Sequence, residues 1–265
     1  MKNGVRPAVL FWVALGLAAS TASAQDSALR TVHVFVALAD NQSQGIVPVA
    51  AKLGNGEDPE RNLYWGSAYG VKTFFARSAD WERIKCGEKP KAEIPERCVF
   101  KYRAGNVYLV ADAYRGREIR QAILDFLASA AGDDPQTMTV PAATGALKLP
   151  TRGGANLVAY IGHDGLMDFQ LTQFPRKKND VHRDAVVLAC ASKQFFAEPV
   201  RASGAYPLLW TTGLMAPEAY TLKSALDGWI AGEHNDQIRD RAAGAYDKYQ
   251  KCGFRAAHRL LTSGW

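Results

Sequence analysis

The sequence lacks the short motifs that mark several common enzyme classes. It contains no G-x-G-x-x-G fingerprint and no G-x-x-x-x-G-K-[ST] loop, which removes support for nucleotide-binding enzymes. It contains no G-x-S-x-G elbow, so serine hydrolases of that type lose support as well. Neither H-E-x-x-H nor C-x-x-C occurs, and these are common zinc-binding motifs. There is also no internal repeat and no low-complexity tract.

Concentrated positive charge is missing too. The net charge is +6, but the basic residues are scattered apart from "RKK" at positions 176–178. A nucleic-acid-binding protein would show a basic face with interleaved aromatic residues, so we expect no nucleic-acid partner. Beyond the N-terminus no apolar run is long enough to cross a bilayer, so we expect no stable membrane insertion of the mature chain.

The first 24 residues are typical of a secretory signal peptide. Lys2 and Arg6 give a positive start, "AVLFWVALGLAA" is an apolar core, and "ASA" at positions 22–24 is a small-residue cleavage site. The apolar core is too short to span a membrane as a helix, although an uncleaved anchor is the alternative. We therefore expect a periplasmic or secreted protein whose mature chain begins at Gln25.

Only four cysteines are present, and the first two predict a disulfide. An exported protein meets an oxidising compartment, where pairing is the default. Cys86 and Cys98 enclose "GEKPKAEIPER", a polar segment with two prolines that a disulfide would tie down. Cys190 and Cys252 are either a second disulfide or two free thiols.

Strands and helices alternate along the chain. Apolar, β-branched runs predict strands at residues 31–40, 98–103, 106–116, 156–162, 184–191 and 206–213. Helical spacing predicts helices at residues 62–84, 117–132, 216–231 and 234–252, and a Pro- and Thr-rich connection follows residue 132. Because the strands are apolar on both faces, we predict an α/β three-layer sandwich with a largely parallel central sheet, and a single domain over residues 25–265.

Two of these strands end on reactive side chains. "LVAYIGHDG" places His163 after one strand, and "AVVLACAS" places Cys190 after the next. Ligand sites of open parallel sheets lie at the carboxyl ends of the strands, and neighbouring strands are about 4.8 Å apart. A nearby imidazole promotes the nucleophilic thiolate form of a cysteine. We therefore predict that these two side chains meet in one cleft as a catalytic dyad.

This pattern resembles the caspase-like cysteine peptidases, which include caspases, legumains, gingipains and clostripains. "TVHVFVALAD" resembles the first strand of that fold, and "YPLLWTTGLMAPEAY" resembles the strand and loop after its catalytic cysteine. The resemblance implies a caspase-like domain and a cysteine endopeptidase that acts on peptide or protein substrates without a cofactor. It also implies that His163 is the general base and Cys190 the nucleophile. The family has a glycine directly after the histidine as oxyanion donor; here Asp164 and Gly165 are the candidates.

Several alternatives stay open. Taken alone, Cys190 is better explained as a small core residue or as half of a disulfide with Cys252, and His163 as a polar cap. The same fold without activity would be a catalytically inactive caspase-like binding protein. Zinc ligand types also occur without a known spacing, so no metal site is predicted; they are His163, Asp164, Asp168, His182 and Cys190. Trp210 is either a wall of the substrate pocket or part of the core.

Overall fold

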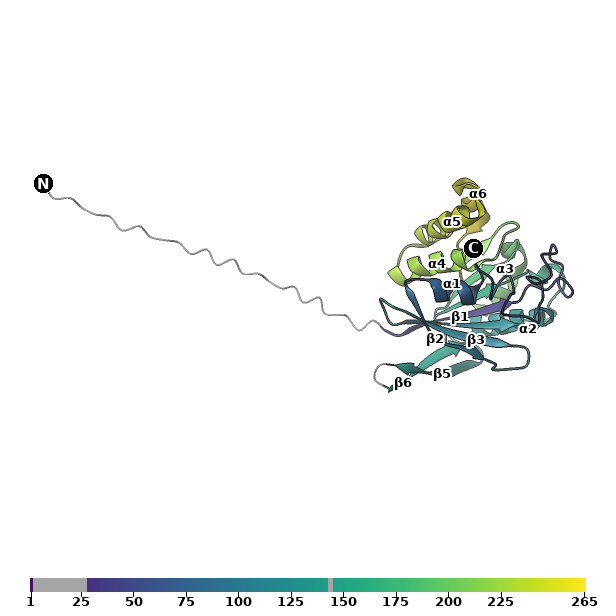
Figure 1. The fold of residues 1–265 in the computed structure, drawn as a ribbon, viewed down its shortest axis with the longest axis horizontal. Helices are drawn as coiled ribbons and strands as arrows, with labels where there is room; N and C mark the ends of the chain where they lie inside the picture. Colours follow the sequence, from purple (N-terminus) through teal and green to yellow (C-terminus); the bar gives the residue numbers. More distant parts are fainter. Residues whose placement is uncertain (2–27, 143–144) are drawn as a thin grey trace.

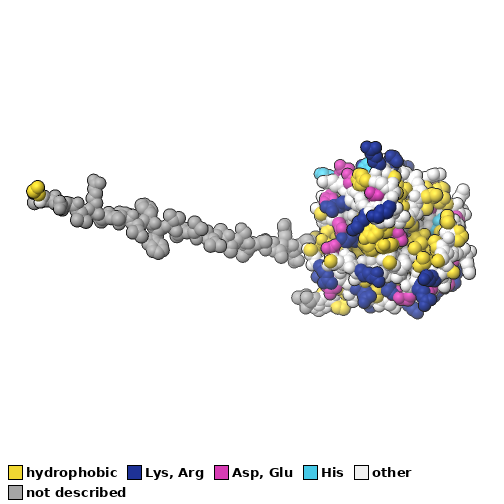
Figure 2. Space-filling view, turned by 45° about the horizontal axis from the view of Figure 1, so that its top comes forward, with side chains coloured by type: hydrophobic (Ala, Val, Ile, Leu, Met, Phe, Trp, Pro, Cys, Tyr) yellow, Lys and Arg dark blue, Asp and Glu magenta, His cyan; other side chains and the backbone are white. Residues whose placement is uncertain are grey.

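The computed structural model describes residue 1 and residues 28–142 and 145–265. The rest of the predicted signal peptide, with its cleavage site, lies outside the described residues. Among the described residues, no helix is both long and apolar enough to cross a membrane. On the face shown in Figure 2, basic side chains lie in separate groups among acidic and apolar ones.

An eight-stranded mixed sheet organises the described chain, in the order β10-β9-β8-β7-β1-β4-β3-β2. The five strands from β9 to β4 run parallel to one another, while β3, β2 and β10 are added antiparallel at the two edges. The largely parallel sheet is therefore confirmed. The strands are β1 (Arg30–Ala37), β2 (Trp81–Glu88), β3 (Glu96–Tyr102), β4 (Val107–Tyr114), β7 (Leu157–Ile161), β8 (Asp184–Leu188), β9 (Tyr206–Thr211) and β10 (Leu261–Thr262).

Helices cover both faces of this sheet. One face carries α1 (Val71–Arg77), α4 (Ala219–Ala231), α5 (Asn235–Gln250) and α6 (Phe254–Leu260), and the other carries α2 (Ile119–Ala130) and α3 (Ser192–Ser203). Figure 1 shows α4, α5 and α6 above the sheet. Strand β1 explains the two cores, because its alternate residues point to opposite faces. Val34 packs in the core with α1 and α4, and Phe35 packs in the core with α2 and α3.

The connection after α2 is a β-hairpin, which was not predicted. Strands β5 (Pro135–Ala142) and β6 (Gly145–Arg152) pair with each other in a separate two-stranded sheet. The hairpin lies below the main sheet in Figure 1 and packs Val140 and Leu149 against β3 and β4. Proline is tolerated in such edge strands, and this composition hides the alternation that normally reveals a strand.

The long helix predicted for residues 62–84 was wrong. Only α1 is helical there, and Trp81 begins strand β2, where it packs edge-on against Phe75. The cause lies in two glycines, since a Cβ on Gly66 would collide with the backbone of Glu60 and one on Gly70 with the backbone of Trp65. The chain makes tight turns at these points instead of helical ones. Helices α3 and α6 were not predicted.

The first disulfide prediction is confirmed. Cys86 and Cys98 are bonded, with Cα atoms 4.1 Å apart, and they join β2 to β3. Cys190 and Cys252 are both free, so the second of the two alternatives left open for them holds in this structure.

Candidate active site

The two reactive side chains follow neighbouring strands. β7 and β8 are adjacent and parallel, and their last residues, Ile161 and Leu188, are register partners. His163 lies two residues beyond the end of β7 and Cys190 two residues beyond the end of β8. Both side chains therefore emerge at the same edge of the sheet, as predicted.

His163 and Cys190 line one cavity of about 420 Å³, a size typical of small-molecule or side-chain binding pockets. Most of its wall is apolar. The rest of the lining comes from the loop after β1, the turns before α1, the segments after β7 and β9, and helix α5. These residues are Gly45, Ile46, Val47, Val49, Leu63, Tyr64, Gly162, Met167, Leu214, Met215, Ala216, Pro217, Glu218 and Gln250.

The strand order explains why a cavity forms here. After β1 the chain forms β2, β3 and β4 on one side of β1, and it then crosses to β7 on the other side. Connections that leave the carboxyl ends of β1 and β7 thus diverge over opposite faces, which opens a crevice between them. The loops after β1 and β7 both contribute to the cavity, which places it at this switch point.

His163 is held in one orientation by a carboxylate. Its side chain is only 7% exposed, and Nε2 lies 2.7 Å from Oδ2 of Asp168. The same Oδ2 accepts a hydrogen bond from the backbone N–H of Gly45 at 2.9 Å, which ties the loop after β1 to the histidine. If Nε2 donates to Asp168, Nδ1 is left as the basic nitrogen. Asp168 was considered only as a zinc ligand, and its role as the partner of His163 was missed.

Cys190 lies at a sharp strand-to-helix turn. Its Sγ accepts a hydrogen bond from the backbone N–H of Met215 at 3.4 Å. Ala191 follows in the left-handed region with φ 47°, and α3 begins at Ser192. The N–H of Ser192 donates to Oγ1 of Thr211 at 3.1 Å, which fixes the turn to β9.

The two candidate oxyanion donors differ. The Gly165 N–H already donates to the carbonyl of His163 at 3.0 Å, whereas the Asp164 N–H donates to no acceptor among the described residues. The Asp164 side chain is fully buried and does not line the cavity. Its Oδ1 accepts from the N–H of Leu166, while Oδ2 has no partner. Burial, with the nearby Asp168 charge, raises the pKa of Asp164 to about 7.

Two further residues of the cavity carry titratable groups. The hydroxyl of Tyr64 has no hydrogen-bond partner among the described residues. Burial is the main cause that raises its pKa, and the neighbouring Cys190 and Glu218 raise this pKa further. Glu218 is 8% exposed, and burial raises its pKa as well. Tyr64 belongs to an aromatic stretch that was visible in the sequence, but nothing in the sequence marks Glu218.

Other candidates lie elsewhere. His182 is exposed and bonds Asp184 at the amino end of β8, opposite to Cys190, so the structure does not bring the five zinc-type residues together. Trp210 is fully buried in the core with α3, which favours the packing alternative. A more open groove of about 700 Å³ lies between α1, α4 and α5, but its lining contains neither cysteine nor histidine.

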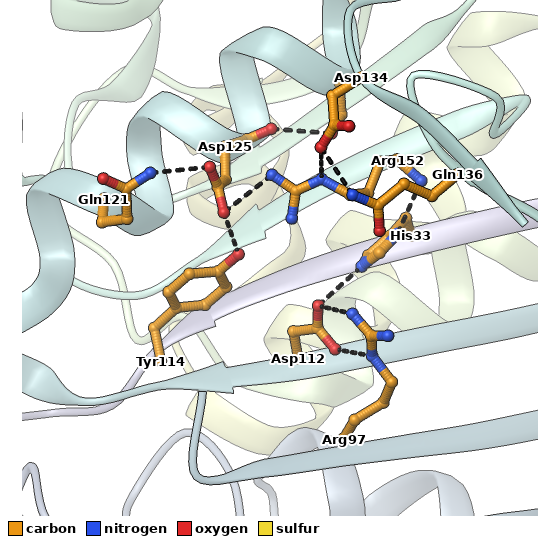
Figure 3. Close-up of polar contacts among 10 residues, drawn as sticks. His33, Arg97, Asp112, Tyr114, Gln121, Asp125, Asp134, Gln136 and Arg152 are labelled. Atoms are coloured by element: carbon orange, nitrogen blue, oxygen red, sulfur yellow. Dashed lines mark hydrogen bonds and ion pairs between the residues drawn. The ribbon is translucent and has the colours of Figure 1, made fainter. Parts of the chain in front are cut away.

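A second polar cluster holds the hairpin to the sheet (Figure 3). His33 accepts a hydrogen bond from the backbone N–H of Arg152 through Nδ1, so its Nε2 proton faces Asp112 at 3.1 Å. Asp112 in turn accepts from Nε and Nη2 of Arg97 at 2.5 and 2.7 Å. None of these residues lines the cavity, and their bonds to one another give them a structural role.

The titratable groups that line the cavity are a thiol, an imidazole, a phenol and one carboxylate, and the carboxylate that holds the imidazole lies outside the lining. This set contains a nucleophile, a base and hydrogen-bond donors, which is what acyl transfer needs. Comparison with models of protein families, with curated proteins and with solved structures finds no match to this chain.

Proposed function

We propose that this protein is an exported cysteine endopeptidase with a caspase-like fold, in which His163 is the general base and Cys190 the nucleophile. One observation carries the proposal: both side chains line the same cavity at the carboxyl ends of adjacent parallel strands. Export is supported by the signal-like N-terminus and by the Cys86–Cys98 disulfide, because disulfides persist in oxidising compartments.

The proposed chemistry is amide hydrolysis through a thioester. His163 takes the proton from the thiol of Cys190, and the thiolate forms a bond to the substrate carbonyl carbon. The imidazolium then gives this proton to the leaving amine as the C–N bond breaks. Water, activated by the same imidazole, hydrolyses the thioester, which releases the acid and restores the thiol. Asp168 holds the ring and stabilises the imidazolium during both steps.

The oxyanion of the tetrahedral intermediate needs hydrogen-bond donors. The Tyr64 hydroxyl is one candidate, since it lines the cavity and donates to no acceptor among the described residues. The Asp164 N–H is also unpaired among the described residues, but Asp164 is fully buried and outside the lining, so a substrate would reach it only after a local shift. The raised pKa of Tyr64 keeps its proton in place at neutral pH. A donor that faces an apolar cavity would stabilise the developing negative charge more strongly than water does.

The competing proposal is a catalytically inactive caspase-like binding protein of the periplasm or cell exterior. Two features favour it. Asp164 stands where the resembled family has a glycine, and the Gly165 N–H already bonds the His163 carbonyl. Both features weaken the oxyanion site and leave the thiol and the imidazole in place.

Alkylation of the two free thiols separates these proposals, because Cys252 is an exposed internal control. At pH 6 a dyad thiolate makes Cys190 react with iodoacetamide faster than Cys252, and His163→Ala slows Cys190 alone. Cys190→Ala abolishes cleavage of a mixed peptide library, and Cys252→Ala does not. The peptidase proposal fails if His163→Ala leaves the Cys190 rate unchanged. A reactive Cys190 without any cleavage supports the inactive binding protein.

A further inference from the structure

The cavity lining contains an acidic side chain but no lysine or arginine to balance its charge. Among the residues that line it there is no lysine or arginine, and Glu218 is the one carboxylate. The other ionisable groups of the lining are Tyr64, His163 and Cys190. A cavity with a single acidic group and no basic one repels anionic ligands and attracts cationic ones.

The Glu218 carboxylate is positioned but not neutralised. It precedes the first residue of α4, yet it makes no capping hydrogen bond to that helix. Instead, Oε2 accepts from the hydroxyl of Tyr220 at 2.8 Å and from the side-chain amide of Gln250 at 3.2 Å. No ion pair of Glu218 with a described basic residue is present, and Oε1 has no hydrogen-bond partner among the described residues. A buried carboxylate without a counter-ion is costly, and a cation from outside the chain would remove that cost.

We infer that Glu218 is a specificity-determining residue that binds the cationic side chain of a peptide substrate beside Cys190. That the ligand is a peptide rests on the proposed peptidase function. The cation itself follows from the cavity, whose volume and apolar wall accommodate an aliphatic stem that ends at Glu218.

The hydrogen bonds of Glu218 favour lysine over arginine. Oε2 already receives two donors, which occupy its two acceptor positions, and only Oε1 remains open. A guanidinium gains most from two parallel hydrogen bonds to both oxygens of a carboxylate, and this arrangement is blocked here. A lysine ammonium needs a single oxygen. We therefore expect the order lysine, then arginine, then an uncharged side chain of similar length.

The first experiment measures selectivity with matched peptides that are acetylated at the N-terminus and amidated at the C-terminus. They differ at one position, which carries Lys, Arg, norleucine or Asp. In the wild-type protein kcat/KM for the Lys peptide exceeds that for norleucine by about tenfold or more. Glu218→Gln keeps the shape but removes the charge, so this ratio falls toward one. The matched control Glu82→Gln, at an exposed residue of β2, keeps the wild-type ratio. An unchanged ratio in Glu218→Gln overturns the inference.

The second experiment needs no catalysis and so separates the two proposals. Calorimetry measures the binding of three ligands to the wild-type protein and to Glu218→Gln. The ligands are N-acetyl-lysine amide, N-acetyl-norleucine amide and a lysine-free peptide whose N-terminal amine is not blocked. Binding of N-acetyl-lysine amide that weakens about tenfold in Glu218→Gln supports the cation site, even if no peptide is cleaved. Equal affinity in both proteins overturns it, even if peptides are cleaved. Preference for a free α-ammonium over the lysine side chain also overturns it.

Discussion

At the residue scale, Asp168 connects the proposed base to the wall of the cavity. One carboxylate oxygen contacts both Nε2 of His163 and the N–H of Gly45. The orientation of the imidazole and the position of the loop after β1 are thus set together. This is the arrangement in which a third group orients a base for an adjacent nucleophile.

Asp168→Asn tests this arrangement directly. The asparagine amide can donate to Nε2, which moves the ring proton to Nδ1 and removes the basic nitrogen from the thiol. We expect kcat to fall by about 10²- to 10⁴-fold, by analogy with the loss of the orienting carboxylate in serine peptidases. The rate of Cys190 alkylation at pH 6 falls as well. Asp180→Asn, at an exposed residue that pairs with Lys177, serves as the control; an equal effect of both variants contradicts the role of Asp168.

Asp164 gives a pH-dependent prediction about stability. Its folded-state pKa is raised to about 7 by burial, so the folded protein keeps a proton that the unfolded chain releases near pH 4. The wild type therefore loses stability as the pH rises from about 4 to 7. Asp164→Asn resembles the protonated form and avoids this loss.

Urea unfolding at pH 4.5, 5.5, 6.5 and 8 measures the difference between Asp164→Asn and the wild type. The variant should become progressively more stable relative to the wild type up to about pH 7, and the difference should then level off. Asp236→Asn, at an exposed position of α5, should show no such trend. A constant difference for Asp164→Asn would show that the carboxyl titrates normally.

At the element scale, the turn between β8 and α3 holds the thiol. Ala191 has a left-handed backbone, which costs free energy in any residue with a Cβ, and hydrogen bonds on both sides keep it there. Such strain persists when the surrounding structure over-determines it. The Cys190 side chain is consequently presented to the cavity by a rigid turn.

Ala191→Val should therefore be poorly tolerated. A β-branched residue fits the left-handed region worse than alanine does, so we expect the free energy of unfolding to fall by about 1–3 kcal/mol and Cys190 to react more slowly. The comparison is Ala202→Val within α3, where only helix propensity changes and the cost should stay below about 0.7 kcal/mol. Denaturant unfolding of both variants gives the two values. Equal costs would mean that the turn is not strained.

The elements were predictable where local pattern decides them. β7 and β8 are apolar on both faces, and α2 carries a clear apolar stripe, so both types were found from the sequence. The hairpin β5–β6 and the tight turns before α1 depend on packing against distant strands and on glycine contacts, which local pattern does not contain. The same holds for the site. His163 and Cys190 end predictable strands, whereas Glu218 is brought in by the chain after β9.

At the scale of the whole molecule, the sheet separates stability from the proposed chemistry. The cavity lies over β1, β7, β8 and β9, while the disulfide joins β2 and β3 at the other edge of the sheet. A disulfide of this span constrains the unfolded chain and is worth about 3 kcal/mol. Its loss should affect the edge strands and leave the cavity intact.

The double variant Cys86→Ala/Cys98→Ala tests this separation. We expect the free energy of unfolding to fall by about 2–4 kcal/mol, while the alkylation rate of Cys190 relative to Cys252 stays at the wild-type value. Cys252→Ala controls for the loss of a cysteine that is not paired. A large change in Cys190 reactivity would show that the two edges are coupled.

The place of β1 in the sheet also determines the order in which the protein can fold. β1 is the first strand of the described chain, yet it lies in the middle of the sheet, between β4 and β7. Val32 has Leu109 as partner on one side and Leu157 on the other. A chain that emerges from its N-terminus during synthesis must keep this apolar strand unpaired until its middle third has followed. Such long-range pairing makes folding slow, and until it forms the unpaired apolar strand can aggregate.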